Sequence, residues 1–471
     1  MHLMNRSTLG AGLFLLTTSA SFASGFAIVE QSVKGLGSAF SNTAEASDAS
    51  AMFFNAAALG RLRGTEAMAA THVIAPSAEF TDGGSFLTPA VTGGIAVAGS
   101  LTVTSVPSDG DGSVVGIIPN LYIHHQVEQL FNGRLHLGLG VNAPFALKTN
   151  YDAGWVGRYQ ALTSSVRTTN INPSFAFELT PEFTLGAGFS AQYIQARLTN
   201  AIDQSTVCLG FEAAVVIAPG TCGAVFGLGT PGSVASDVTA EVRDARDWSL
   251  GWNVGFLWEP IESTRIGMHY RSKIVHRLDG TATFSNVHPT LAALTAGAPG
   301  VTALVRQAAS AKVTLPETAS LHVYHAFNGH WAAHADISWT GWSRFEALDV
   351  RFGDGTRSLQ PQGWDNSMRY SGGITYTHDD ALTLRAGAAF DETPVPSATL
   401  RTPRIPDADR TWITLGATYR VNQNFSVDLA YAHLFVDDPQ LRNADVRTGH
   451  TVVGTYQADV DIIGVQVGYQ F

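Results

Sequence analysis

Apolar side chains alternate with small or polar ones along most of this chain, in segments of about ten residues. Between residues 183 and 193, for example, Phe183, Leu185 and Phe189 alternate with Thr184 and Ser190. Successive residues of a β-strand point to opposite faces, so each segment has one apolar face and one small or polar face. Two architectures accommodate this pattern: a soluble sandwich with the apolar face inward, or a membrane barrel with the apolar face toward lipid.

The length and spacing of the segments favour the membrane barrel. About ten residues is the length that a tilted strand needs to cross the hydrocarbon core. Short turns at 180–182, 378–380 and 422–424 alternate with longer loops, as they do at the two ends of an outer-membrane barrel. Tryptophans gather near the segment ends, as an interfacial girdle requires: Trp248, Trp252, Trp258, Trp331, Trp339 and Trp342.

The last residues of the sequence point to the same architecture. Ile463, Val465, Val467 and Tyr469 share one face of a final segment that ends in Phe471, the form in which outer-membrane barrels end. The sequence therefore predicts an all-β fold, a transmembrane antiparallel β-barrel in the outer membrane of a Gram-negative bacterium. About fourteen strands are expected, an even number as in bacterial barrels, at 65–79, 116–127, 134–143, 166–179, 183–196, 239–258, 263–280, 313–327, 331–349, 367–378, 381–391, 410–421, 424–435 and 456–471.

The N-terminus has the three parts of a secretory signal. Arg6 supplies the positive charge, residues 9–18 the apolar core, and the residues up to Ala23 a small-x-small cleavage site. The apolar core is shorter than the roughly 20 residues of a membrane helix. We therefore expect residues 1–23 to act as a signal peptide and the protein to be exported.

Charge and motifs argue against several classes of function. The chain has 28 Lys and Arg against 39 Asp and Glu, a net charge of −11, which disfavours a nucleic-acid partner. The stretch 35–40 lacks the third glycine of a dinucleotide loop, and His330 and His334 lie on a strand-like stretch rather than on a zinc-binding helix. The G-x-S-x-G motif is missing from the sequence. We predict no metal site, no cofactor and no enzymatic activity; a Ser–His pair assembled across barrel strands stays open.

Four longer stretches separate the segments, at 80–113, 198–237, 284–311 and 436–454. The second and third are apolar and alanine-rich, which predicts short helices with apolar faces that mark a binding surface. Packing of these loops on themselves is the alternative. The candidate residues of an apolar groove are Val215, Val216, Ile217, Val225, Phe226, Leu291, Leu294, Val301 and Leu304.

The chain contains two cysteines, Cys208 and Cys222, close together in the second of these stretches. In an exported protein such a pair predicts a disulfide that closes a small loop. Two free thiols are the alternative, because spacing alone does not bring the two Cβ atoms together.

Several stretches of the sequence resemble the FadL family of outer-membrane transporters for long-chain fatty acids and other hydrophobic compounds. The stretch from "SGFAIVEQ" to "NAAALGRL" (24–62) is similar to the mature N-terminus of the family, and "PVPSATLRTPRIPDADR" (394–410) is the most specific match. The resemblance implies a barrel of residues 63–471 with long extracellular loops, closed by an N-terminal hatch of residues 24–62 inside the lumen. The barrel is expected to act as a monomer.

The resemblance also implies a function, the uptake of hydrophobic molecules and above all of long-chain fatty acids. The ligand is expected to enter an apolar groove among the outer loops and to move to a pocket inside the barrel. It then leaves sideways into outer-membrane lipid, through a gap that a kink in the third strand opens. Aromatic hydrocarbons are the alternative cargo, and a general porin and a barrel lipase are alternatives of other classes.

Candidate residues follow for the kink and for the hatch. Asn142, Ala143 and Pro144 end the third strand, where Pro144 removes a ladder donor; an ordinary strand end with proline in the next loop is the alternative. Asn55, Ala56 and Ala57 stand where relatives have Asn-Pro-Ala, so this turn lacks the fixed φ of proline.

The ligand-binding candidates are both apolar and basic. Phe26, Phe53 and Phe54 are expected to contact the barrel wall or the ligand, and a short helix in this part of the hatch is compatible with that role. Arg197 and Arg369 are candidates for holding a carboxylate head group, since a buried carboxylate requires a cation or several donors. Pairing of either arginine with Asp or Glu in the lumen is the alternative.

Overall fold

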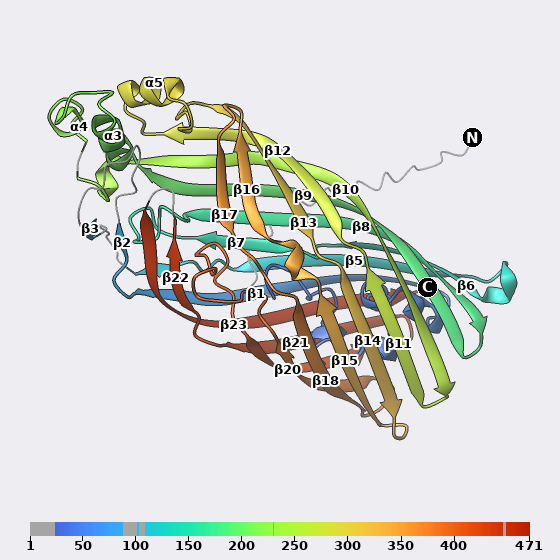
Figure 1. The fold of residues 1–471 in the computed structure, drawn as a ribbon. Helices are drawn as coiled ribbons and strands as arrows, with labels where there is room; N and C mark the ends of the chain where they lie inside the picture. Colours follow the sequence, from blue (N-terminus) through green and yellow to red (C-terminus); the bar gives the residue numbers. More distant parts are fainter. Residues whose placement is uncertain (1–23, 88–100, 103–108, 229, 446–448) are drawn as a thin grey trace, which may run out of the picture.

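The protein is a closed antiparallel β-barrel of fourteen strands, which confirms the predicted fold class (Figure 1). The computed structural model describes residues 24–87, 101–102, 109–228, 230–445 and 449–471; the predicted signal peptide, residues 1–23, lies outside them. Short segments that continue one another share a strand of the barrel. In order around the barrel the strands are β1 (Thr65–Asp82), β5 (Gly116–Val127), β6 (Leu135–Asn142) with β7 (Ala146–Asn150), β8 (Thr163–Thr180), β9 (Phe183–Asp203), β10 (Asp237–Ile261), β11 (Thr264–Arg271) with β12 (Ile274–Ser285), β14 (Thr318–Ala326) with β13 (Gln307–Leu315), β15 (Trp331–Thr340) with β16 (Ala347–Phe352), β18 (Ser367–Thr377) with β17 (Arg357–Pro361), β19 (Leu382–Asp391), β20 (Arg410–Arg420), β21 (Phe425–Val436) and β23 (His450–Gln470).

The barrel closes where its first strand meets its last. β1 pairs with β23 over seventeen positions, from Glu66 opposite Gln470 to Asp82 opposite Gly454. At the loop end the short strands β2 (Phe86–Leu87), β3 (Leu101–Thr102), β4 (Gly110–Asp111) and β22 (Gln440–Ala444) extend the sheet. Closure leaves no free sheet edge along these two strands, as a lipid environment requires.

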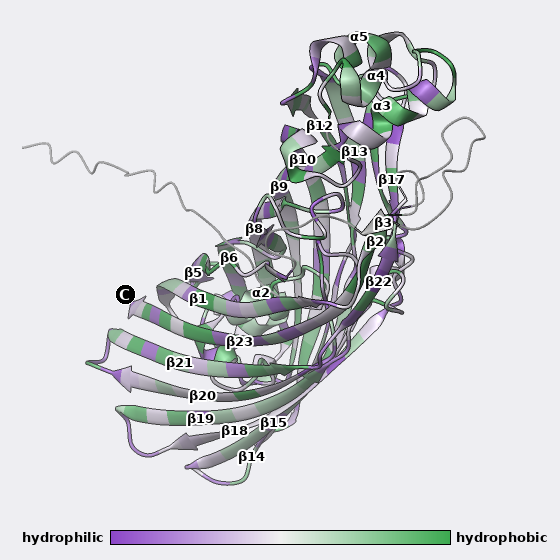
Figure 2. Ribbon diagram, turned by 90° about the vertical axis from the view of Figure 1, so that its left-hand side faces the viewer, coloured by the Kyte–Doolittle hydropathy of each residue, from purple (hydrophilic) through white to green (hydrophobic). Residues whose placement is uncertain are grey.

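The alternation of the sequence is an alternation between lipid and lumen. On β23, Ile463 and Val465 are exposed on the outside, whereas Gly464 and Gln466 face inward and are buried. Figure 2 shows the corresponding alternation of hydrophobic and hydrophilic residues along the strands. Four of the girdle tryptophans are exposed, namely Trp248, Trp252, Trp258 and Trp331. Trp342 is a correction to the predicted girdle: β15 ends at Thr340, and a short 3-10 turn, η5 (Trp342–Arg344), carries its ring into the interior.

The third strand is interrupted between β6 and β7. Both halves pair with β8, but the ladder between β5 and the third strand ends at Leu121 opposite Val141. No ladder among the described residues joins β7 to β5, so the Gly116–Asn120 part of β5 has a partner in β1 only. The prediction of a strand end with proline in a following loop is therefore incomplete, because the strand resumes at Ala146.

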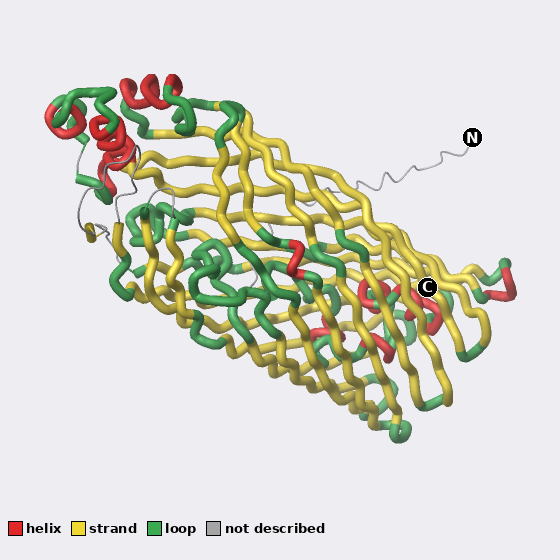
Figure 3. Tube along the Cα trace, in the orientation of Figure 1, coloured by secondary structure: helices red, strands yellow, loops and turns green. Residues whose placement is uncertain are grey.

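Residues 24–62 lie inside the barrel, and we call them the hatch segment (Figure 3). They form α1 (Val33–Leu36), η1 (Thr43–Glu45), α2 (Ala51–Phe54) and η2 (Ala56–Arg61). Glycines on the wall let this segment approach closely: a Cβ on Gly186 would lie 2.2 Å from the Ala57 nitrogen, and one on Gly416 2.7 Å from the Gly37 Cα. The glycine-rich lumenal faces of the strands thus accommodate the hatch segment.

Short helices cover the loop end of the barrel. They are α3 (Gln204–Ala213), α4 (Thr221–Ala224) and α5 (Pro289–Gly297), with the turn η4 (Val234–Ser236) beside them and η3 (Phe131–Gly133) at the opposite end. A disulfide joins Cys208 to Cys222 and links α3 to α4. These helices lie in the two stretches for which the sequence predicts short helices.

Among the described residues, no helix has both the length and the apolar character needed to cross a bilayer.

Candidate functional site

The part of the chain that the structure describes forms three sizeable cavities along the inside of the barrel. The outer cavity opens near the loop end and encloses about 1030 Å³, open solvent included. The apolar cavity lies beside it with about 820 Å³, and the lumenal cavity, with about 960 Å³, lies between the hatch segment and the wall. Leu198, Val242 and Arg404 line both the outer and the apolar cavity, so these two cavities are adjacent.

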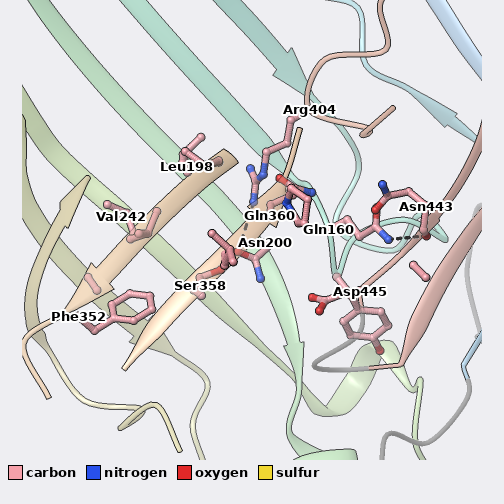
Figure 4. A pocket seen from close by; sticks show the side chains of 18 of the residues that line it. Gln160, Leu198, Asn200, Val242, Phe352, Ser358, Gln360, Arg404, Asn443 and Asp445 are labelled. Atoms are coloured by element: carbon pink, nitrogen blue, oxygen red, sulfur yellow. Dashed lines mark hydrogen bonds between the residues drawn. The ribbon is translucent and has the colours of Figure 1, made fainter. Parts of the chain in front are cut away.

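The outer cavity has an apolar and a polar side (Figure 4). Leu198, Val242 and Phe352 supply the apolar side, while Gln160 and Arg404 lie on the polar side. Arg404 is buried, and burial lowers the pKa of its guanidinium to about 10. Its Nη1 donates to Ser164 Oγ at 3.0 Å, and no described carboxylate forms an ion pair with it. A cation without a carboxylate partner therefore stands where the two cavities meet.

The apolar cavity is bounded by aliphatic side chains of β8, β9, β10, β12 and β13, including Val166, Ile194 and Leu278. At the hatch segment it ends at Phe26. This ring packs in a buried aromatic cluster, with ring centres 4.8 Å from Trp342, 5.7 Å from Phe345, 6.0 Å from Phe145 and 6.1 Å from Trp364. The aromatic cluster separates the apolar cavity from the lumenal cavity.

The lumenal cavity has one apolar wall. Ile28, Phe40, Phe53 and Phe54 of the hatch segment line it, together with Phe145 from the interruption of the third strand. Phe54 lies 5.1 Å from Phe53 and 5.8 Å from Phe40, measured between ring centres. Phe40, Phe53 and Phe54 of the hatch segment thus form a continuous aromatic surface that lines the lumenal cavity.

Two buried arginines also line the lumenal cavity and contact the hatch segment. Arg271 on β11 donates from Nη2 to the Phe53 carbonyl at 2.6 Å, and its guanidinium lies 4.6 Å from the centre of the Phe53 ring. Arg369 on β18 donates from Nη2 to the Ala39 carbonyl at 2.9 Å and lies 5.1 Å from the Trp412 ring. Neither guanidinium forms an ion pair with a described carboxylate. Arg271 is therefore available to an anionic group in the cavity, whereas Arg369 has Asp391 opposite it in the β18–β19 register, and Asp391 and Asp336 line the same cavity.

A buried acid of the hatch segment lies near this cavity. Glu30 is fully buried, and neither of its carboxylate oxygens has a hydrogen-bond partner among the described residues. Burial raises the pKa of Glu30 from 4.5 to about 7, against the attraction of Arg369 and Arg410. At neutral pH the carboxyl is thus close to the point where it loses its proton.

The hatch segment is hydrogen-bonded to the interruption of the third strand. The Ile28 nitrogen donates to the Pro144 carbonyl at 2.8 Å, and the Ala146 nitrogen donates to the Phe26 carbonyl at 3.1 Å. Gln31 Nε2 donates to the Ala143 carbonyl at 3.0 Å. The backbone groups that the kink frees from the barrel ladder are thus partly satisfied by the hatch segment.

The predicted turn of the hatch segment is anchored on the barrel wall. Asn55 Oδ1 accepts from the Ala57 nitrogen at 3.0 Å, and its Nδ2 donates to the Phe256 carbonyl at 2.9 Å. Ala56 and Ala57 are fully buried. At the kink, Asn142 is buried and its Oδ1 accepts from Asn170 Nδ2 at 3.1 Å.

Several predicted ligand residues lie away from the three cavities. The side chain of Arg197 is 56 % exposed on the outside of β9 and pairs with Glu241, Nε to Oε1 2.7 Å. Val215 and Val216 are 82 % and 56 % exposed in the loop after α3, and Val225, directly after α4, is 72 % exposed. The remaining loop candidates pack on one another and on both cysteines in a single cluster between the two loops, which agrees with the alternative that these loops pack on themselves. They are Ile217, Phe226, Leu291, Leu294, Val301 and Leu304.

Arg271 and Arg404 are cavity residues that the sequence analysis did not single out. Arg271 and His269 occupy inward positions of β11, alternating with outward Met268 and Tyr270. A charged side chain on the small or polar face of a barrel strand is the signal that identifies Arg271. Arg404 lies in a proline-rich loop without periodicity, so nothing in the sequence pattern assigns it to a face.

Comparisons with known proteins identify the family. The family model described as outer membrane protein transport protein (OMPP1/FadL/TodX) matches residues 14–471. The long-chain fatty acid transport protein of Escherichia coli is 28% identical over 92% of each chain. Among solved structures, a Pseudomonas aeruginosa FadL homologue aligns over 95% of this chain and 100% of its own, with 24% identity and a TM-score of 0.80. The toluene transporter TbuX of Ralstonia pickettii aligns over 90% and 94%, with 17% identity and a TM-score of 0.59. This chain therefore belongs to the FadL/TodX family of outer-membrane transport proteins for hydrophobic compounds.

Proposed function

We propose that this protein, acting as a monomer, takes up long-chain fatty acids across the outer membrane by a passive route without enzymatic turnover. The ligand enters the outer cavity, passes through the apolar cavity to the lumenal cavity, and leaves sideways into the membrane at the interruption between β6 and β7. Residues 1–23 act as the signal peptide, residues 24–62 as a movable hatch, and residues 63–471 as the barrel.

The observation that carries this proposal is the composition of the lumenal cavity. It combines the aromatic side chains Phe40, Phe53 and Phe54 with two buried arginines. Arg271 has only uncharged hydrogen-bond partners, and Arg369 lies opposite Asp391. A buried methylene contributes about 0.8 kcal/mol, so an alkyl chain is stabilised against the aromatic wall. A carboxylate head group gains charge-assisted hydrogen bonds from the arginines.

The lateral exit is supported by the contacts between the hatch segment and the kink. Residues 26–28 and 144–146 exchange backbone hydrogen bonds, and Ala27 lies opposite Phe145 in an antiparallel bridge. A shift of the hatch segment breaks these bonds and uncovers the place where β5 lacks a partner. The tail of a fatty acid then enters lipid without crossing the aqueous periplasm.

Uptake by cells that lack their own transporter of this kind tests the route. We expect wild-type protein to support oleate uptake, and the variant Ala27→Cys/Phe145→Cys to lose it when the new cysteines are oxidised and to regain it after reduction. Wild-type protein treated identically is the control for effects on Cys208 and Cys222. Full uptake with the hatch segment cross-linked to the kink contradicts the route.

The same assay decides the class of cargo. Replacing Arg271 by Met keeps an apolar side chain beside Phe53 but removes the charge, so we expect oleate uptake to fall about tenfold, the loss of a roughly 1.4 kcal/mol charge-assisted contact. Toluene, which has no head group, serves as the matched substrate. Uptake of toluene but not of oleate by wild-type protein identifies an aromatic hydrocarbon channel instead, and release of free fatty acid from an ester by purified protein identifies a lipase.

A further inference from the structure

A row of basic side chains crosses the outside of one half of the barrel, near its loop end. On β8, β9, β10, β12, β13, β16 and β17, which lie side by side (Figure 1), seven exposed cations point away from the lumen. We call them the basic row: Arg167, Arg197, Arg246, Arg277, Lys312, Arg351 and Arg357. Three acids share this face, Glu241, Asp279 and Asp349. At the bulge of β10 the exposed Arg243 and Asp244 pair with each other at 3.9 Å and add no net charge. The row therefore carries a positive excess on a chain with a net charge of −11.

The outward direction of these cations follows from their neighbours. Val166, Ile194, Ala245 and Leu278 line the apolar cavity, and each precedes or follows a member of the basic row or its cross-strand partner. Successive residues of a strand point to opposite faces, so the cations face the surroundings of the barrel. The register places Arg167 and Arg246 on either side of Gln195.

Most of the positive charge in the row is not neutralised. Arg197 pairs with Glu241 at 2.7 Å and Arg351 with Asp349 at 3.2 Å. Arg246 has Asp279 directly opposite it between β10 and β12, although no described acid lies within ion-pair distance of the other five members. The Arg167 guanidinium donates to the uncharged Gln195 Oε1 at 2.6 Å. Exposed cations in this number leave a strong positive potential over the row.

Two pairs in the row set like charges directly opposite each other. Arg277 is the register partner of Lys312 between β12 and β13, and Arg351 is the partner of Arg357 between β16 and β17. Directly opposed side chains on one face lie about 5 Å apart at Cβ, and like charges in that position destabilise a sheet. An anion that lies over both members converts the repulsion into two attractions.

The surface next to the basic row faces lipid. On β10, Trp248 and Leu250 follow Arg246 on the same face and are 58 % and 77 % exposed. On β12, exposed Val275 precedes Arg277 on the same face. The row therefore lies at the margin of the apolar belt, where lipid head groups begin. On the other side of the barrel the corresponding face of β23 carries Asp459 and Asp461 instead.

We infer that the basic row binds the phosphate-bearing head groups of anionic lipid in the surrounding outer leaflet. Arginine presents a planar fork that binds phosphate through two hydrogen bonds, and six of the seven cations are arginines. A lipid with two phosphates spans an opposed pair such as Arg277 and Lys312. Its alkyl chains then lie on the exposed apolar side chains of the same strands.

Lipid retention by the purified full-length protein tests this inference. The variant Arg277→Gln/Lys312→Gln removes one opposed pair, and Arg306→Gln/Arg442→Gln removes two exposed cations outside the row as the matched control. The probes are lipid A, a diphosphorylated glycolipid, and phosphatidylcholine, each added to delipidated protein in a non-ionic detergent. Native mass spectrometry counts the bound lipids, and thermal unfolding reports their effect on stability.

We expect wild-type protein and the control to retain lipid A over phosphatidylcholine, and the row variant to bind lipid A about tenfold more weakly. Without lipid, the row variant unfolds at a higher temperature than wild type because a like-charge contact is gone, and lipid A stabilises it less. Equal retention by the row variant and wild type overturns the inference. So does an equal loss in the control, or displacement of lipid A by millimolar inorganic phosphate, which identifies a site for a soluble anion.

Discussion

At the scale of single residues, burial in the hatch segment changes the pH at which Glu30 ionises. Its side chain is fully buried, and its pKa is raised from 4.5 to about 7 because burial disfavours the ionised form. Arg369 and Arg410 attract the ionised form and Asp391 repels it, but burial is the larger effect. The folded protein therefore holds this proton across a range of pH in which the unfolded chain has lost it.

This pKa makes stability depend on pH. Because the folded pKa lies above the unfolded one, the contribution of Glu30 is fully present below pH 4.5 and is lost as the pH rises through about 7. Glu30→Gln keeps the shape of the side chain without its charge. We therefore expect the variant to have a higher thermal midpoint than wild type at pH 8, with a gain of at most roughly 3 kcal/mol in the free energy of unfolding. At pH 4.5 we expect the two midpoints to differ little. Thermal unfolding of both proteins across this pH range is the measurement, and an equal effect at both ends contradicts the prediction.

At the scale of elements, the hatch segment packs closely against the barrel wall because the wall has glycine at the points of contact. β9 passes the η2 turn so closely that a Cβ at Gly186 overlaps the Ala57 backbone. The residue before it, Leu185, and the residue after it, Ala187, point to the lipid side of the same strand. One strand thus combines a lipid-facing apolar surface with a lumenal surface shaped to the hatch segment.

The variant Gly186→Val tests this close contact. Overpacking of this kind typically costs about 1–3 kcal/mol, so we expect a lower thermal midpoint and easier proteolysis of the hatch segment after Lys34 or Arg61. Ala187→Val, one residue away on the lipid side, adds the same atoms without meeting the hatch segment and serves as the control. Equal destabilisation by both changes argues that the strand itself, and not its contact with η2, is responsible.

At the scale of the whole molecule, the hatch segment and the barrel form one packed interior. Buried residues of the hatch segment share clusters with barrel strands throughout the lumen, as Leu36 does with Ile462 and Met52 with Tyr122. The contacts also include charges, with Lys34 3.2 Å from Asp48 and Asp48 hydrogen-bonded to Gln466 of β23 at 3.0 Å. The hatch segment therefore occupies much of the barrel interior and leaves cavities between itself and the wall.

Deleting residues 25–60 tests whether this segment is what closes the barrel. The lumenal strand faces are small or polar and tolerate water, so we expect the barrel to form and its small-ion conductance in a planar bilayer to rise from near zero to that of an open pore. The variant Cys208→Ser/Cys222→Ser, which alters only the loop cap, is the control. Unchanged conductance after the deletion means that another part of the chain closes the lumen.

The sequence by itself determined the barrel, because a period of two is a local property. Each strand carries its own apolar face, and each expected segment overlaps a strand of the barrel. Several strands extend six or seven residues further toward the loop end than expected, as β9 does to Asp203 and β23 does from His450. The resumption of the third strand as β7 was not predicted, because its five residues are too few to display an alternation.

Only the tertiary structure decided which side chains line the cavities. Arg197 and Arg369 are both arginines in strands, yet one faces outward and pairs with Glu241 and the other faces the lumenal cavity. Trp342 and Arg404 lie in segments without periodicity, so their direction depends on how the chain turns after the strand ends. A cavity is formed by residues far apart in the chain, and their meeting depends on barrel closure and on the position of the hatch segment, neither of which is encoded in a local pattern.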